Sequence, residues 1–262
     1  MECSTDKIEA NWIADPEQFE RDLKSHYNNK KVLFATAMRM GDCLHLLPII
    51  SWYCKTYDIK IDWAICDKTP YYKELVEILS YEKYINKVHI YEFSYIKKWV
   101  ESPKINCCFR PYSNVSNELN LKFNNYYDNV YCFGFDENQY YARSIKFFSD
   151  HFAEEHGFGV DYDYKLNYGN PDYTYKDNCV KIDKLYEPQI QNIDAINLDE
   201  SNSIIRNLQL CAGAKEVITV RTGAAIALSL ARIPFKIKFI DYDYEWYKNL
   251  CHTITGGIDI IS

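Results

Sequence analysis

Short apolar runs alternate with amphipathic stretches in the first half of the chain, which predicts strands alternating with helices. The strand runs, such as Val32-Leu33-Phe34-Ala35, are apolar throughout, as is typical of strands that helices cover on both faces. Strands are expected at 31–36, 59–65, 87–91 and 104–109, and helices at 16–28, 42–55, 70–80, 94–100 and 138–155. This order predicts right-handed βαβ units and therefore a doubly wound parallel sheet of the α/β class.

The second half repeats the alternation in a shorter form. Gly157-Phe158-Gly159 breaks the helix expected at 138–155, and a polar, Tyr-rich stretch follows at 161–178. We place a domain boundary here, which divides the chain into domains 1–160 and 161–262. The remaining expectations are a long loop with some helix at 111–130, helices at 201–212, 224–231 and about 244–250, strands at 216–220 and 236–240, and an irregular C-terminal end.

Charge and cysteine content narrow the class of protein. A formal net charge of -7 argues against a dedicated nucleic-acid binder, which normally carries a basic surplus. The 10 cysteines include no CxxC pair, which indicates reduced thiols in a cytoplasmic setting and not a zinc knuckle. Residues 1–12 lack the order of a signal peptide, and no apolar stretch approaches the roughly 20 residues of a transmembrane helix.

The loop after the first strand carries the strongest candidate for chemistry. Ligands of open α/β sheets bind at the carboxyl ends of strands, and Gly41 would let the backbone approach a substrate closely there. Asp42 follows at the helix start, where a carboxylate either takes a proton from an attacking hydroxyl or simply caps the helix. Arg39, Gly41 and His45 are candidates for the acceptor side, with helix packing the favoured role for His45. Pro48 is expected to delay or kink the helix.

A second candidate site follows the strand at 216–220. Arg221-Thr222-Gly223 reads as a tight turn that leads into a helix of small residues. The free N–H groups at the start of that helix, together with its dipole, suit an anion such as a nucleotide diphosphate. Arg221 would add a charged contact and Thr222 a hydroxyl contact to phosphate. An ordinary turn with Thr222 as the helix cap accounts for the same residues.

Two acidic pairs have simpler explanations. Asp199-Glu200 reads as a capping segment for the helix at 201–212. Asp241-Tyr242-Asp243 has the spacing of a carboxylate pair that holds a divalent ion, but its place at the end of a strand favours a solvated strand end. The sequence contains no GxGxxG, P-loop, HExxH or GxSxG motif.

The segment Gly41-Asp42-Cys43-Leu44-His45-Leu46-Leu47-Pro48 resembles the N-terminal motif of the heptosyltransferases. In that family, the GT-B enzymes that extend lipopolysaccharide cores, a similar motif directly follows the first strand. The family also has a D-T-G turn and a helix that hold the donor diphosphate. Here Thr222-Gly223 matches that turn, Arg221 replaces its Asp, and Ile226 stands where the family has a His. The resemblance covers 32–92 well and 197–240 moderately.

The resemblance implies a compact GT-B fold, with two Rossmann-like domains facing each other across a cleft and a reduced C-terminal domain. It implies a glycosyltransferase that takes its sugar from a nucleotide-sugar donor, and it assigns the role of catalytic base to Asp42. Arg221, Thr222 and Gly223 would bind the donor. Enzymes of this family need no bound metal, and the nucleotide sugar is a substrate, so no cofactor is expected.

Two questions stay open at the level of sequence. The acceptor is either a saccharide or a hydroxylated base in modified phage DNA, the latter requiring a basic cleft built from residues such as Arg39, Arg110, Arg143 and Lys146. The alternative to an enzyme is a non-catalytic α/β protein that binds a nucleotide or a partner, which the departures at Arg221 and Ile226 favour. The sequence gives no prediction of oligomeric state.

Overall fold

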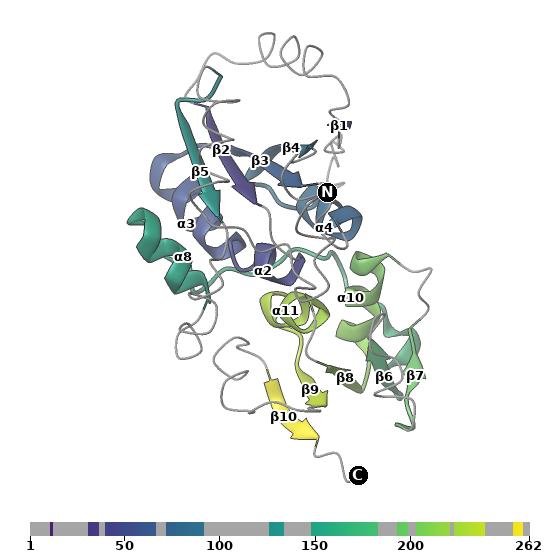
Figure 1. Cartoon of the computed structure of the whole chain (residues 1–262). Helices are drawn as coiled ribbons and strands as arrows, with labels where there is room; N and C mark the ends of the chain where they lie inside the picture. Colours follow the sequence, from purple (N-terminus) through teal and green to yellow (C-terminus); the bar gives the residue numbers. More distant parts are fainter. Residues whose placement is uncertain are drawn as a thin grey trace, which may run out of the picture. The chain divides into compact units, whose positions relative to one another are not determined.

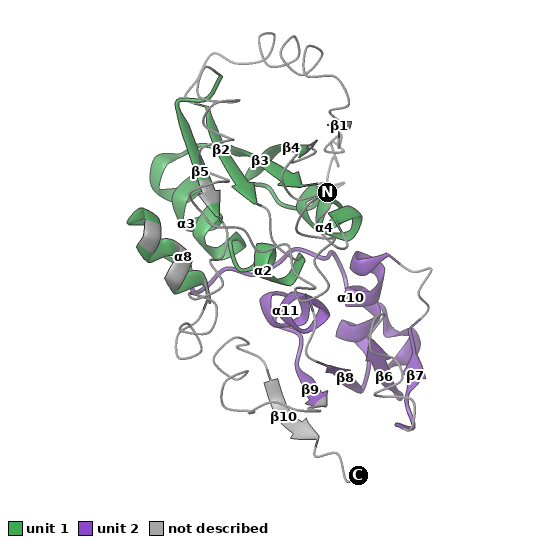
Figure 2. Ribbon diagram, viewed as in Figure 1, with its two compact units in different colours: residues 1–143, 149–161 green, residues 144–148, 162–262 purple. Residues whose placement is uncertain are grey.

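The chain forms two compact units (Figure 2). Unit 1 comprises residues 1–143 and 149–161, and unit 2 comprises residues 144–148 and 162–262. The computed structural model describes residues 11–12, 31–36, 40–66, 72–91, 126–133, 148–182, 193–198, 203–220, 223–238 and 254–258, to which the following account is confined. The change of unit after Asp161 lies one residue beyond the domain boundary expected at 160/161.

Unit 1 is built on a five-stranded parallel sheet with the order β1-β4-β3-β2-β5 (Figure 1). Its strands are β1 (Asn11–Trp12), β2 (Val32–Thr36), β3 (Ile61–Cys66), β4 (Ile85–Tyr91) and β5 (Asn129–Phe133). The strands expected at 31–36, 59–65 and 87–91 are confirmed. The loop expected at 111–130 is wrong at its end, because Asn129 and Val130 already belong to β5. The strand expected at 104–109 and the helices expected at 16–28 and 94–100 lie outside the described residues.

The helices of unit 1 are α2 (Met40–Leu44), α3 (Leu47–Tyr57), α4 (Tyr72–Ser80) and α8 (Phe148–His156). The single helix expected at 42–55 is therefore interrupted at His45 and Leu46. Pro48 lies in the first turn of α3, where its missing N–H costs no helical hydrogen bond. The amide of Leu46 donates to the carbonyl of Cys43 at 3.0 Å and closes the turn between the two helices. Of the helix expected at 138–155, only the part from Phe148 onward is described.

An aromatic cluster packs α3 against one face of this sheet. Phe34 of β2 and Tyr131 of β5 are register partners, so their side chains project from the same face. Their ring centroids lie 5.5 Å apart, and Tyr53 of α3 lies 5.6 Å from Phe34. Phe158, from the break after α8, completes the cluster at 5.1 Å from Tyr53. These contacts bury the apolar face that the strand pattern predicts.

A buried polar network joins three segments of the same unit. The hydroxyl of Tyr127 donates to Asp62 Oδ2 at 2.9 Å and lies 3.1 Å from His89 Nε2. Asn86 Nδ2 donates to the other carboxylate oxygen of Asp62 at 2.8 Å. His89 Nε2 also lies 3.4 Å from Asp62 Oδ2, so the three side chains meet at this carboxylate oxygen. The network lies near the amino end of β3, away from the strand ends that lead into the helices.

Unit 2 has its own five-stranded parallel sheet, with the order β10-β9-β8-β6-β7 (Figure 1). Its strands are β6 (Cys179–Ile182), β7 (Ile196–Asn197), β8 (Glu216–Val220), β9 (Phe235–Lys238) and β10 (Ile254–Ile258), and its helices are η1 (Tyr173–Tyr175), α10 (Ile204–Gly213) and α11 (Gly223–Leu230). The strand expected at 216–220 is confirmed, and the one expected at 236–240 is confirmed over 236–238, with β9 beginning one residue earlier and residues 239–240 lying outside the described residues. The sequence did not predict β6 or β7, and the irregular C-terminal end that it predicted is wrong at 254–258, where β10 pairs with β9. The helix expected at 244–250 lies outside the described residues.

The start of α10 corrects one detail. The helix begins at Ile204, not near Ser201, and its N-cap is Ser203, whose hydroxyl oxygen accepts from the amide of Arg206 at 3.1 Å. Asp199 and Glu200, which we expected to cap this helix, lie outside the described residues and precede the cap by several positions. Ser is among the best N-cap residues, so the local chemistry explains the later start.

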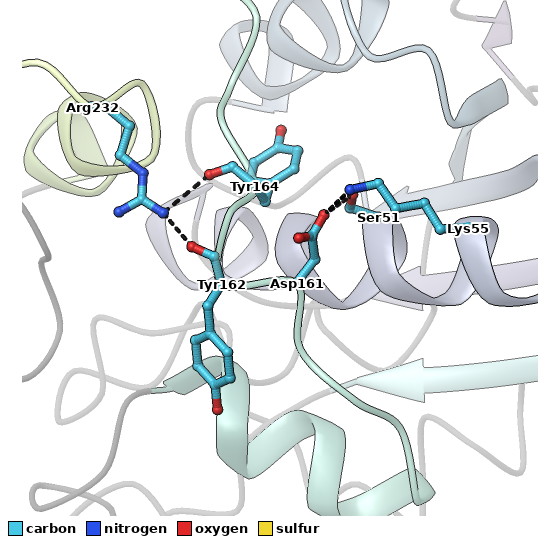
Figure 3. Close-up of polar contacts among 6 residues, drawn as sticks. All are labelled: Ser51, Lys55, Asp161, Tyr162, Tyr164 and Arg232. Carbon is cyan, nitrogen blue, oxygen red and sulfur yellow. Dashed lines mark hydrogen bonds and ion pairs between the residues drawn. The ribbon is translucent and has the colours of Figure 1, made fainter.

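Side-chain contacts hold the chain just before and just after the point where it passes from unit 1 to unit 2 (Figure 3). In unit 1, the carboxylate of Asp161 accepts from the hydroxyl of Ser51 and pairs with the ammonium of Lys55, both at 2.5 Å. In unit 2, the guanidinium of Arg232 donates to the backbone carbonyls of Tyr162 and Tyr164. Each anchor uses residues of a single unit, so each unit fixes its own end of the junction.

Candidate functional site

The strand order of unit 1 singles out the carboxyl end of β2. From β2 the chain continues to β3 and β4 on one side, whereas β5 pairs with β2 on the other side. The direction in which successive strands are added to the sheet therefore reverses next to β2. In open α/β sheets such a reversal leaves a crevice outside the carboxyl ends of the strands, and ligands bind there. The segment that follows β2 is thus the first place to look for a site.

Asp42 lies in this segment, as the third residue of α2. Met40, Cys43 and Leu44 are buried and anchor the short helix, whereas Gly41 and Asp42 keep part of their surface exposed. The sequence prediction that a helix starts here holds, with Met40 as its first residue. Arg39, the third acceptor-side candidate of this loop, lies outside the described residues. The structure thus offers one partly exposed carboxylate just beyond the carboxyl end of a central strand.

His45 is buried, with 2% of its surface exposed. Its backbone carbonyl accepts a hydrogen bond from the hydroxyl of Ser149, in α8, at 2.7 Å. The burial of the side chain agrees with helix packing, the role that the sequence favours for this residue.

The sequence did not predict a buried hydrogen bond that lies at the carboxyl end of β2. Thr36 is the last residue of β2 and Trp63 lies in β3, and both are completely buried. The indole Nε1 of Trp63 donates to the hydroxyl oxygen of Thr36 at 3.0 Å. A buried indole N–H needs an acceptor, so a Trp in an apolar strand is a signal to look for one. The sequence alone does not say that Thr36 supplies it.

Unit 2 has a reversal of its own between β6 and β8. The neighbour of β6 on one side is β7, and the strands β8, β9 and β10 follow on its other side. Thr219, in β8, donates its hydroxyl proton to the carbonyl of Ile182 at 2.8 Å, which ties the ends of these two strands together. The helix after β8 begins at Gly223, and Ala225 and Ala227 are completely buried along it. Arg221 and Thr222, the other donor-side candidates, lie outside the described residues.

The described residues show neither a cluster of metal ligands nor a membrane-spanning helix. Across those ranges no three His, Cys, Asp or Glu side chains gather closely enough to hold a metal ion, and Asp241 and Asp243 lie outside them. Within the same part of the chain, no helix has both the length and the apolar character needed to cross a bilayer. Cys43, Cys54, Cys66, Cys179 and Cys211 are free thiols.

The similarity to known proteins lies in the fold and not in the sequence. No protein-family model matches the chain, and no curated protein matches it. Among solved structures, the heptosyltransferase WaaC of E. coli with ADP aligns with a TM-score of 0.53 at 12% sequence identity, over 87% of this chain and 92% of WaaC. A glycosyl transferase family 9 protein from Veillonella parvula DSM 2008 aligns with a TM-score of 0.58 at 10% identity, over 89% of this chain and 87% of that protein.

These alignments extend over most of both chains, so they cover both parallel sheets and not a single shared domain. Their level of identity speaks for the fold alone. The two Rossmann-like sheets expected from the sequence are therefore present, and the chain has the α/β, GT-B-like fold of the heptosyltransferase structures that it resembles.

Proposed function

We propose that the chain is a glycosyltransferase that moves a sugar from a nucleotide-sugar donor to an acceptor hydroxyl, with Asp42 as the general base. The observation that carries the proposal is the position of Asp42. It is a partly exposed carboxylate in the helix that follows β2, beside the reversal of a parallel sheet. Ligands of open α/β sheets bind in the crevice at such a reversal. The GT-B-like fold makes glycosyl transfer the reaction to test first.

In the proposed reaction, the Asp42 carboxylate takes the proton of the acceptor hydroxyl. The acceptor oxygen then forms a bond to the anomeric carbon of the donor sugar, and the bond from that carbon to the diphosphate breaks. The nucleoside diphosphate leaves with the electron pair. The start of α11 at Gly223, with Arg221 and Thr222 just before it, would stabilise the charge that develops on the leaving diphosphate.

The donor is the first part of the proposal to test. The WaaC structure that resembles this chain holds ADP, so ADP-sugars head a panel that also contains UDP-, GDP- and CMP-sugars. A donor that binds the folded chain raises its thermal midpoint in a concentration-dependent way. Donors that stabilise the chain are then assayed for release of the nucleoside diphosphate, with simple saccharides as acceptors. Stabilisation without any release would favour the non-catalytic nucleotide-binding alternative.

Two finer parts of the proposal have their own tests. The proposed reaction uses protein groups alone, so turnover should persist in excess EDTA. A loss of turnover that Mg²⁺ or iron restores would contradict metal independence.

A saccharide is the proposed acceptor. The residues that would form a basic DNA cleft, Arg39, Arg110, Arg143 and Lys146, lie outside the described residues. A mobility-shift assay over a salt titration would reveal a DNA acceptor through a steep salt dependence.

A further inference from the structure

We infer that Thr36 and Ser149 are positioning residues for Asp42. Each makes one buried hydrogen bond, Thr36 before the helix α2 that carries Asp42 and Ser149 after it. The inference rests on the proposed function and names the groups that would hold its base in place. Both bonds lie within unit 1, and both belong to residues that the proposed reaction does not itself use. Neither residue has a place in the heptosyltransferase-like motif.

The first bond fixes the strand end from which the loop starts. Thr36 is the final residue of β2, and α2 begins at Met40, so only three residues separate the strand end from the helix. Trp63 Nε1 donates to the Thr36 hydroxyl at 3.0 Å. Trp63 is the register partner of Phe34, so its ring lies on the face of the sheet that Phe34 and Thr36 share. The bond ties the last residue of β2 to the neighbouring strand.

The second bond fixes the turn by which the chain leaves the helix. His45 directly follows α2, and its carbonyl accepts from Ser149 at 2.7 Å. Ser149 is completely buried near the start of α8, a helix more than 100 positions away in the chain. A carbonyl at the end of a helix has no partner within the helix and needs a donor from a side chain, water or a tightened turn. Here a distant helix supplies the donor and holds the turn.

The length of α2 explains why such support is needed. The helix has five residues, too few for its own hydrogen bonds to hold it in place. Its position therefore depends on the burial of Cys43 and Leu44 and on the residues that hold its two ends. A general base must lie within hydrogen-bond reach of the proton that it takes, and a displacement of about 1 Å lowers rates strongly. Thr36 and Ser149 would keep the Asp42 carboxylate within that reach.

Amide hydrogen exchange tests the inference without a nucleotide-sugar donor or an acceptor substrate. The variants Thr36→Val and Ser149→Ala each remove one bond with little change in shape, and Thr36→Ser keeps the hydroxyl. Tyr127→Phe is the matched control, because it removes a buried hydrogen bond of the same unit that does not reach α2. We expect amides of 40–46 to exchange about tenfold faster in the first two variants, and at the wild-type rate in Thr36→Ser and Tyr127→Phe. Unchanged exchange at 40–46 in both variants would overturn the inference.

Turnover measurements then show whether the hydrogen bonds of Thr36 and Ser149 matter for catalysis by Asp42. With any donor that the wild-type chain cleaves, Thr36→Val and Ser149→Ala should lower kcat about ten- to a hundredfold and leave KM for the donor unchanged. Tyr127→Phe and Thr36→Ser should keep the wild-type kcat. Wild-type kcat in both Thr36→Val and Ser149→Ala, beside an inactive Asp42→Asn, would overturn the inference and leave the proposed function standing. Full activity of Asp42→Asn would instead remove the proposed function, and the exchange result would still decide whether the bonds hold α2.

Discussion

Gly213, the last residue of α10, lies directly against the backbone carbonyl of Asp172, so that a Cβ at position 213 would overlap the carbonyl oxygen. The same contact is reinforced by the amide of Asp172, which donates to the carbonyl of Gln209 at 2.9 Å. Helix and chain therefore meet backbone to backbone, at a distance that only glycine permits. The sequence offers no sign of this, because an isolated glycine near a helix end is commonly read as a stop signal.

Gly213→Ala should therefore destabilise the chain. The added methyl group meets backbone atoms that cannot rotate away, and overpacking of this kind costs about 1–3 kcal/mol. Urea unfolding measures the loss. Lys215→Ala, at an exposed position two residues further on, is the control and should change the free energy of unfolding by less than about 0.5 kcal/mol. Equal stability of Gly213→Ala and the wild-type chain would contradict the close contact.

Tyr127→Phe should lower the free energy of unfolding by about 1–3 kcal/mol, because it leaves Asp62 and His89 without a hydroxyl that both contact. Asp62→Asn weakens the same network from its other end. Since the two residues share one hydrogen bond, their effects should not add in a double-mutant cycle. Strict additivity would show that the bond between Tyr127 and Asp62 contributes nothing to stability.

The buried thiol of Cys54 makes the stability depend on alkaline pH. Burial raises the pKa of this thiol from its ordinary value of 9.0 to about 12. The folded chain therefore keeps the proton where the unfolded chain loses it. The corresponding stability is fully present below about pH 9 and is lost as the pH rises towards about 12.

Urea unfolding under reducing conditions, at about pH 8 and about pH 10.5, tests this dependence in the wild-type chain and in Cys54→Ala. The wild-type free energy of unfolding should fall more steeply with pH, by up to about 1.4 kcal/mol per pH unit. Cys54→Ala is expected to be less stable at both pH values, because it also loses packing. The comparison therefore uses the change in the free energy of unfolding with pH and not its absolute value. Parallel slopes in the two proteins would refute the assignment to Cys54.

The elements that the sequence predicted are those in which local pattern and tertiary environment agree. β2 and β3 are buried throughout, with Asp62 as the one charged residue among them, and β8 is buried after Glu216. The missed strands break that pattern. β6 carries Lys181, whose ammonium is buried and donates to the carbonyl of Ile193 at 3.2 Å, and β10 contains two adjacent glycines, which strands normally avoid. Only pairing with neighbouring strands makes these segments extended.

The same division applies to the candidate site. The position of Asp42 after the first strand could be predicted, because strand, loop and helix follow one another in the sequence. The bonds that Thr36 and Ser149 make could not, because their partners are 27 and 104 positions away. Contacts of this separation depend on how the whole sheet and its helices pack, and no local pattern encodes them.

The central claim is that Asp42 is the base, and replacement by Asn tests it most directly. Asn has nearly the same shape as Asp but cannot take a proton, so binding should survive while chemistry fails. In a turnover assay with a donor that the wild-type chain accepts, Asp42→Asn should lower kcat by about 10²–10⁴-fold and keep the wild-type thermal shift with that donor. Asp58→Asn, at an exposed left-handed position that Asn also tolerates, should retain full activity. Wild-type turnover by Asp42→Asn would contradict the account.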